Sequence, residues 1–168
     1  MWVKKNLGEM KPKEFISWTL IQEIRDVVFQ HPYLSFLLMS VGIEFLGKCR
    51  FTKKQSWQEI TPSEGYSEGE KLMSEVDPRY AQINLQKQLR NGIAHAFLPK
   101  SQIALSEAKH GAIHFSKTSQ GQIILVAEIF YRDFVIACKK VLETEFPTND
   151  KVNLDFMYTG PSMVVGML

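Results

Sequence analysis

The sequence predicts a mainly α protein: an antiparallel helical bundle with a small three-stranded antiparallel sheet inserted before the last long helix. Apolar residues recur at helical spacing over 13–30 and 32–49, and the short break between these segments predicts an antiparallel pair. A third helical pattern covers 79–96. The period alternates over 102–126 before a last helical pattern over 127–145. Helices on both sides of a short alternating stretch indicate a bundle with a β insert.

Length and composition predict one domain. The chain has 168 residues, 45% of them hydrophobic and 23% charged, which is typical of an ordinary globular protein. No internal repeat divides it, so we expect a single domain over 1–168, with a tail at 148–168 that has no clear period. The formal net charge of +2 is too small to indicate a nucleic-acid partner by itself.

The cysteines and the apolar runs bear on the compartment. Cys49 and Cys138 lie far apart in the sequence and form no metal-ligand spacing, so we expect reduced core thiols and neither a metal nor another cofactor. The N-terminus lacks the apolar run of a signal peptide. The longest apolar stretch, Tyr33 to Leu46, is shorter than the roughly 20 residues of a membrane span. We therefore expect a cytoplasmic protein that does not contact a membrane.

The first two helices have clear boundaries. Pro12 suits the first turn of a helix from about Lys13 to Gln30, and His31 precedes a proline, which disfavours the helical conformation. The second helix, from Pro32 to Cys49, is apolar almost all round, which predicts packing on several sides.

The segment 50–78 has the composition of a solvated connection, with at most a short helix over 70–76. The third helix is expected over 79–96. Gly92 within it costs about 1 kcal/mol relative to alanine. That cost suggests that another backbone approaches the helix closely at this residue.

Three short strands are expected in the insert. Ile103 and Leu105 alternate with polar neighbours, as do Ile113 and Phe115, and 122–126 supplies the third strand. Glycine-containing segments at 109–111 and 119–121 are typical of turns.

The most informative stretch combines Arg90, Asn91 and His95 within six residues of the third helix. A guanidinium pairs phosphate oxygens through a planar fork, and an imidazole carries a proton near neutral pH. Those groups suit chemistry on a phosphodiester. The alternative is structural: an arginine that caps local carbonyls and a histidine satisfied near a helix end.

An antiparallel helical core, a late helix with the pattern Arg-Asn-x-x-x-His and a final long helix together make this chain resemble the HEPN superfamily, the higher-eukaryote and prokaryote nucleotide-binding domains. The family signature is an arginine followed four to six residues later by a histidine, which Arg90 and His95 match. Phe97 stands where a toxin subgroup often has a tyrosine, and the β insert also departs from the minimal bundle.

The resemblance implies a bundle that dimerises with two motif helices meeting across the interface. It implies a metal-independent endoribonuclease, possible in toxin or defence roles, with RNA or a nucleotide as ligand and a cognate antitoxin as partner. Other members bind RNA or nucleotides without catalysis, or serve protein interaction. Arg90, Asn91 and His95 would be the catalytic residues.

Helix geometry bears on the dimer independently. Five residues at about 100° each place Arg90 and His95 roughly 140° apart around an ideal helix. A symmetric partner could supply the second set of groups. In the expected reaction His95 exchanges a proton with the ribose 2′-hydroxyl or the departing oxygen, Arg90 stabilises phosphate charge and Asn91 orients the phosphate or the imidazole.

Several further residues are weaker candidates. Glu44 could orient Arg90 or pair with Lys48 four residues on. Tyr66 could stack on a base or anchor the connection to the bundle. A basic cluster could contact an RNA backbone, although a solvated surface explains it as well. Its members are Lys48, Arg50, Lys53 and Lys54.

His110 and His114 lie in the insert without a third partner at metal-ligand spacing. Both are expected at the surface.

Overall fold

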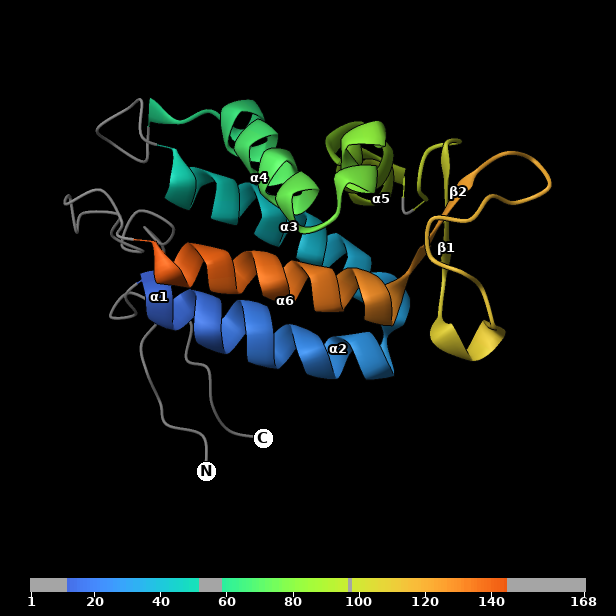
Figure 1. Cartoon of the computed structure of the whole chain (residues 1–168), viewed down its shortest axis with the longest axis horizontal. Coiled ribbons are helices and arrows are strands. Elements are labelled where there is room, and N and C mark those ends of the chain that lie inside the picture. Colours follow the sequence, from blue (N-terminus) through green and yellow to red (C-terminus); the bar gives the residue numbers. More distant parts are fainter. Residues whose placement is uncertain (1–11, 52–58, 97, 145–168) are drawn as a thin grey trace.

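A computed structural model describes residues 12–51, 59–96 and 98–144 of the chain. It is mainly helical, with two strands at one end of the bundle (Figure 1). The principal elements are α1 (Pro12–Phe15), α2 (Ile24–Gln30), α3 (Pro32–Arg50), α4 (Pro62–Val76), α5 (Asn91–Ala96), β1 (Ile103–Ser106), β2 (Ile123–Val126) and α6 (Ala127–Glu143). The expected mainly α fold is confirmed, whereas the tail at 148–168 lies outside the described residues.

The first two predicted helices and the last one form as expected. A π-helical segment, Ile16–Glu23, joins α1 to α2. His31 has φ −140° and ψ 64°, which ends α2, and Pro32 begins α3. The restriction that proline places on the preceding residue separates the two helices.

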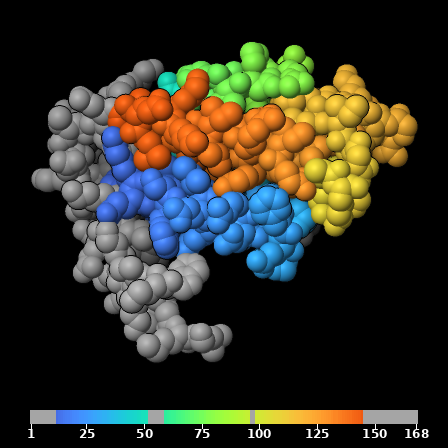
Figure 2. All heavy atoms as spheres, turned by 60° about the horizontal axis from the view of Figure 1, so that its bottom comes forward, coloured from blue at the N-terminus to red at the C-terminus, as the bar shows by residue number. Residues whose placement is uncertain are grey.

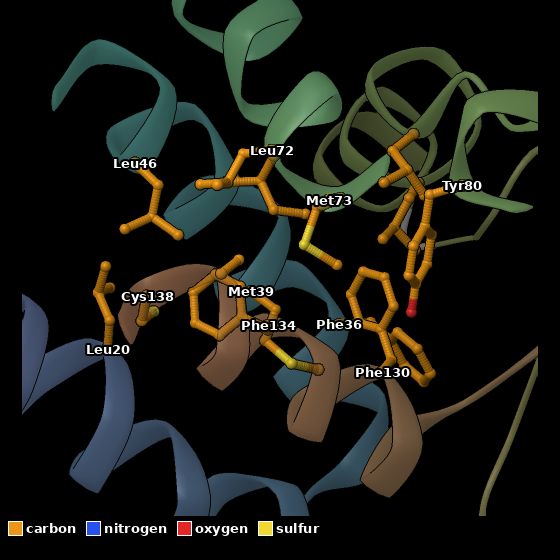
Figure 3. Packing of buried hydrophobic residues seen from close by; sticks show 14 of the residues in the cluster. Leu20, Phe36, Met39, Leu46, Leu72, Met73, Tyr80, Phe130, Phe134 and Cys138 are labelled. Carbon is orange, nitrogen blue, oxygen red and sulfur yellow. The ribbon is translucent and has the colours of Figure 1, made fainter. Parts of the chain in front are cut away.

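The core lies between the helices (Figure 3). Leu20, Met39 and Phe134 are among its buried side chains, and α3 and α6 contribute equally many residues to it. Figure 2 shows α6 between the α1–α2 segment and α4. Cys49 and Cys138 are buried free thiols, as predicted, and burial raises the pKa of both. Burial of a large apolar side chain such as Met39 or Phe134 contributes about 1.5–3 kcal/mol to the stability of the fold.

The prediction of a solvated connection before residue 70 is wrong. Helix α4 begins at Pro62, and Thr61 and Glu64 form a capping box: the Glu64 N–H donates to Thr61 Oγ1 at 3.2 Å, and the Thr61 N–H donates to Glu64 Oε2 at 2.9 Å. The misleading residues were Gly65 and Gly69, which lie where α4 crosses α3. They favour the helix pair because they allow a very close backbone contact.

That contact involves a third glycine, Gly47 of α3. A Cβ at Gly47 would collide with the Gly65 carbonyl and the Gly69 nitrogen. Side chains at this crossing are therefore excluded, and the two helix backbones touch. The crossing fixes the position of the α4 residues near the candidate site.

The predicted helix 79–96 is correct only in its second part. A 3₁₀ turn, Pro78–Gln82, is followed by extended backbone at Ile83 with φ −119° and ψ 122°. The helix containing the motif begins beyond Asn84, whose Oδ1 accepts the Lys87 N–H at 2.7 Å. It starts with a π-helical segment, Gln86–Arg90, and continues as α5. Asparagine capping separates the two parts.

The predicted three-stranded antiparallel sheet is wrong. Strands β1 and β2 are parallel, with Ile103 opposite Ile123 and Ser106 opposite Val126. The predicted strand around Ile113 and Phe115 does not form, and beyond it only an isolated antiparallel bridge joins Lys117 to Ile123 within the described residues. The reason lies at Phe115, whose φ of 65° is in the left-handed region and interrupts a regular strand.

Candidate functional site

The motif residues lie at the junction of two helical segments. Arg90 ends the π-helical segment, Asn91 begins α5, and His95 is near the end of that helix. The Arg90 side chain is 31% exposed, and His95 is exposed. In the part of the chain that the structure describes, no hydrogen bond joins the Arg90 and His95 side chains. The two side chains are therefore not hydrogen-bonded to each other in this arrangement.

Arg90 is oriented by two neighbours. Its Nη1 donates to Asn91 Oδ1 at 3.2 Å, and its Nη2 lies 3.7 Å from Glu44 Oε2 on α3. Glu44 Oε1 also lies 3.4 Å from Lys48 Nζ, so both expected partners of Glu44 are present. Ideal charge-assisted hydrogen bonds are about 2.7–2.9 Å long. The guanidinium is therefore directed toward Glu44 without a tight bond to it.

The close approach expected at Gly92 is confirmed. A Cβ there would lie 2.6 Å from the Leu98 carbonyl oxygen and 2.9 Å from the Lys100 nitrogen. The Lys100 N–H also donates to the Gln88 carbonyl at 2.9 Å. The chain after α5 thus folds back against the motif helix, which explains a glycine at this position.

A carboxylate of α4 holds the start of the motif helix. Glu70 Oε1 accepts the Gln86 N–H at 3.0 Å. Burial raises the pKa of Glu70, whereas the backbone N–H groups of Gln86 and Leu85 lower it. An acidic side chain at a helix N-terminus satisfies free N–H groups and interacts favourably with the helix dipole. Glu70 therefore connects α4 to the helix that contains Arg90.

Of the two alternatives for Tyr66, stacking on a base or anchoring to the bundle, the structure shows the second. Tyr66 is fully buried on α4, so it anchors the bundle and does not stack in an open loop. Its hydroxyl has no hydrogen-bond partner among the described residues. Burial raises the pKa of Tyr66 well above its usual value; the negative charge of Glu70 adds to this, Arg90 opposes it and Glu44 adds to it.

The basic cluster is only partly visible. Arg50 Nη1 pairs with Glu75 Oε1 at 2.8 Å, and Lys48 pairs with Glu44. Lys53 and Lys54 lie outside the described residues. Arg50 thus links α3 to α4, and Lys48 pairs with a residue of its own helix. The RNA-binding interpretation of the cluster stays a prediction.

A second polar cluster, which the sequence did not predict, is buried where the β insert meets the bundle. The Tyr80 hydroxyl donates to Asp133 Oδ2 at 3.0 Å and lies 3.1 Å from His114 Nε2. The Val126 N–H donates to His114 Nδ1 at 2.9 Å. Because Nδ1 accepts, Nε2 carries the proton of the neutral ring and donates to the Tyr80 oxygen. We call Tyr80, His114 and Asp133 the insert network.

The surroundings of the insert network keep His114 neutral. Burial lowers the pKa of His114 to about 4, and Arg79 and Arg132 also lower it, whereas Asp133 and Asp77 oppose the change. Arg132 Nη2 pairs with Asp133 Oδ1 at 3.0 Å. The expectation of a surface His114 is therefore wrong, because its ring faces Tyr80, whereas His110 is exposed as expected.

No sequence signal linked the members of the insert network. Tyr80 and Asp133 are 53 residues apart, and His114 lies in a segment whose alternating pattern resembles an exposed strand. Arg79 Cζ lies 4.4 Å from the centre of the Phe115 ring, beside His114. This cation–π contact accompanies the unusual backbone at Phe115.

Two surface cavities lie away from the motif. One of about 400 Å³ is lined at the α2–α3 corner by residues that include His31, Tyr33 and His110. The other, of about 470 Å³, is lined by Glu70 and Tyr80 among others. Arg90, Asn91 and His95 line neither cavity. Among the described residues, no group of three histidine, cysteine or acidic side chains is arranged to hold a metal ion.

Comparisons with protein-family models, curated proteins and solved structures found no match to this chain. Within 12–51, 59–96 and 98–144, no helix combines the length and the apolar character needed to cross a membrane.

Proposed function

We propose that this chain is a HEPN-like endoribonuclease that cleaves RNA without a metal ion and acts as a homodimer through the motif helix. The observation that carries the proposal is the arrangement of the motif at the junction of the π-helical segment and α5. Arg90 and Asn91 are oriented by contacts at 3.2 and 3.7 Å, and His95 is exposed five residues later. In the proposed dimer this arrangement offers the guanidinium of one chain and the accessible imidazole of the other to the same ligand.

The proposed reaction uses the ribose 2′-hydroxyl as nucleophile. His95 removes the proton from that hydroxyl or supplies one to the departing oxygen. Arg90 stabilises the charge that develops on the phosphate oxygens, and Asn91 orients the phosphate or the imidazole. The products carry a cyclic phosphate end, and DNA is not cleaved because it lacks the nucleophile.

The dimer follows from the separation of the two groups. Arg90 turns toward Glu44 on α3, whereas His95 faces solvent without a hydrogen-bond partner among the described residues. A second copy related by a two-fold axis places its His95 beside the Arg90 of the first copy. Each of the two sites then contains groups from both chains.

A second candidate function is favoured by the same free imidazole. Catalytic histidines are usually oriented by another side chain, and no such partner of His95 is present in the described part of the chain. A non-catalytic module that binds RNA, a nucleotide or a protein needs only the Arg90 and Asn91 pair. We rank it second, because it leaves the exposed histidine of the motif without a role.

The resemblance suggests a toxin or defence role with a cognate antitoxin, which we include in the proposal. The buried free thiols of Cys49 and Cys138 suit a reducing cytoplasm.

The deciding experiment incubates the purified protein with mixed cellular RNA in the presence of a chelator. The same reaction is run with His95→Ala and with a DNA substrate. We expect RNA cleavage that His95→Ala abolishes and no cleavage of DNA. Binding of RNA without cleavage by the folded wild-type protein would support the second candidate instead.

A further inference from the structure

Three side chains beside the insert network, those of Asp77, Arg79 and Phe115, form what we call the Arg79 platform. Arg79 Cζ lies over the Phe115 ring, 4.4 Å from its centre. Arg79 Nε donates to Asp77 Oδ1 at 3.0 Å, and Arg79 Nη2 donates to Asp77 Oδ2 at 2.6 Å. One face and one edge of the planar guanidinium are therefore occupied. The Arg79 side chain is nevertheless 57% exposed, so solvent reaches the opposite face.

The insert network holds the Phe115 ring in place. The centre of this ring lies 4.8 Å from that of Tyr80 and 4.2 Å from that of His114, and both contacts are edge-on. The φ of 65° at Phe115 is unfavourable for a bulky residue and persists only where the surroundings enforce it. Such backbone is concentrated at sites that hold a ligand. The insert thus supports the guanidinium with a ring that is kept in position at a conformational cost.

The charge and shape of the platform favour a planar ligand over a phosphate. The hydrogen bonds from Arg79 lower the pKa of Asp77 to about 2, so the carboxylate is charged at neutral pH and offsets the guanidinium. Asp77 also occupies the Nε–Nη2 edge, one of those through which an arginine pairs phosphate oxygens. The open face remains available for stacking, and arginine stacks in this way on unpaired bases of RNA.

The platform lies close to the motif helix along the chain. Arg79 belongs to the 3₁₀ turn Pro78–Gln82, and the π-helical segment that ends at Arg90 begins at Gln86. Figure 1 shows α5 between α4 and the two strands. Arg79 and Arg90 are 11 residues apart, which limits their separation to about 40 Å even for extended backbone. The turn and the helix between them shorten this distance, so one RNA strand can contact both.

We propose that the Arg79 platform binds an unpaired base of the RNA, which stacks on the open face of the guanidinium while the phosphate to be cleaved lies at Arg90. The inference rests on the proposed function and adds a second contact for its substrate, outside the motif. Arg79 contacts the base. Asp77 and Phe115 are positioning residues that fix the plane of the guanidinium.

The test compares two probes that carry the same number of phosphates. One is a single-stranded 2′-O-methyl RNA, which lacks the nucleophile and is not cleaved, and the other is a matched strand without bases. Affinity for each is measured by fluorescence anisotropy at one salt concentration. Arg79→Lys keeps the charge and loses the planar group. It should bind the RNA about 3- to 10-fold more weakly and the abasic strand with wild-type affinity, because one stacked base is lost.

Arg132→Lys is the matched control. The Arg132 side chain is 66% exposed and also pairs with an aspartate, Asp133, at 3.0 Å. In the described part of the chain, however, no aromatic ring lies under its guanidinium. This variant should bind both probes with wild-type affinity. Equal losses of RNA affinity in the two arginine variants would overturn the inference, because the ring under Arg79 would then make no difference.

A double-mutant cycle tests the role of Phe115. Phe115→Leu keeps an apolar side chain and removes the ring, so it should weaken binding of the RNA and not of the abasic strand. In the Arg79→Lys background it should have little further effect on either affinity. Circular dichroism shows whether each variant is folded. Because Arg79 is exposed, the comparison of the two probes decides the question even if Phe115→Leu does not fold.

The remaining outcomes separate this inference from the proposed function. Equal losses of affinity for both probes in Arg79→Lys would identify a phosphate contact and overturn the base platform. Wild-type affinity of Arg79→Lys for the RNA would also overturn it, and cleavage by the wild type would then leave the proposed function standing. A base-dependent loss in a chain that binds RNA without cleaving it would support the platform and overturn the nuclease. A wild-type chain that neither binds nor cleaves RNA would overturn both.

Discussion

The two polar clusters of this molecule are built differently. The insert network joins Tyr80, His114 and Asp133 with hydrogen bonds of 3.0 and 3.1 Å, and each of its side-chain polar atoms has a partner. Around Arg90 the contacts are 3.2–3.7 Å long, and the nearby Tyr66 hydroxyl has none. A fully paired buried network favours one arrangement, whereas an incompletely paired cluster can exchange partners. The comparison suggests that the first cluster maintains the fold, and it agrees with the proposal that the second binds a ligand.

The largest effect is expected from removing Arg90, with removal of Arg132 beside the insert network as the control. Arg90→Ala should lower the rate of RNA cleavage by about 10²–10³-fold, because a guanidinium that stabilises developing phosphate charge is lost. Arg132→Ala removes the arginine that pairs with Asp133 at 3.0 Å and should leave the rate near the wild-type value. Single-turnover cleavage of a labelled RNA measures both. Equal losses in the two variants would contradict the division of roles.

Tyr80→Phe should destabilise the fold by about 2–3 kcal/mol, because the buried groups of Asp133 and His114 lose their shared partner. The free energy of unfolding is obtained from urea titration. The cleavage rate under native conditions should stay within a factor of a few of the wild type, since in the described part of the chain the hydrogen bonds and ring contacts of the Tyr80 side chain go to the insert and to α6 and not to the motif helix. A stable variant without cleavage activity would place the insert network in the active site instead.

The smallest effect is a pH dependence of stability. The pKa of His114 is about 4 in the folded protein, below its ordinary value of 6.5. Between these values the unfolded chain binds a proton that the folded protein does not, so stability is complete above about pH 6.5 and is lost as the pH falls toward 4. The loss attributable to His114 is on the order of 1–3 kcal/mol.

Urea titrations of the wild type and His114→Gln at pH 7 and pH 4.5 measure this contribution. The wild type should lose more stability than the variant, because the variant has no imidazole to protonate. Identical losses would show that His114 does not titrate as its surroundings indicate.

The helices show how far the sequence predicts this fold. The break between α2 and α3 follows from local chemistry at His31 and Pro32, and the structure confirms it. Helix α4 was missed because Gly65 and Gly69 are typical of loops, whereas their role is a contact with α3. The Thr61 and Glu64 capping box was a local signal that predicts this helix.

The sheet and the clusters depended on contacts between distant residues. The parallel pairing of β1 with β2 and the left-handed backbone of Phe115 have no local signature. The spacing of Arg90, Asn91 and His95 made them candidate site residues, which stays a prediction, and the pairing of Glu44 with Arg90 was anticipated as one of two alternatives. Whether the Tyr66 hydroxyl has a hydrogen-bond partner depends on how the surrounding elements pack, so the sequence alone could not predict that it has none among the described residues.

The most direct test of the account mixes two inactive chains. Arg90→Ala and His95→Ala are each prepared as inactive protein, combined in equal amounts, partly unfolded in urea and refolded together. A site built from Arg90 of one copy and His95 of the other is intact once in each mixed dimer. The account predicts that the mixture recovers roughly a quarter of the wild-type RNA cleavage rate. A mixture that forms mixed dimers but shows no cleavage would contradict it.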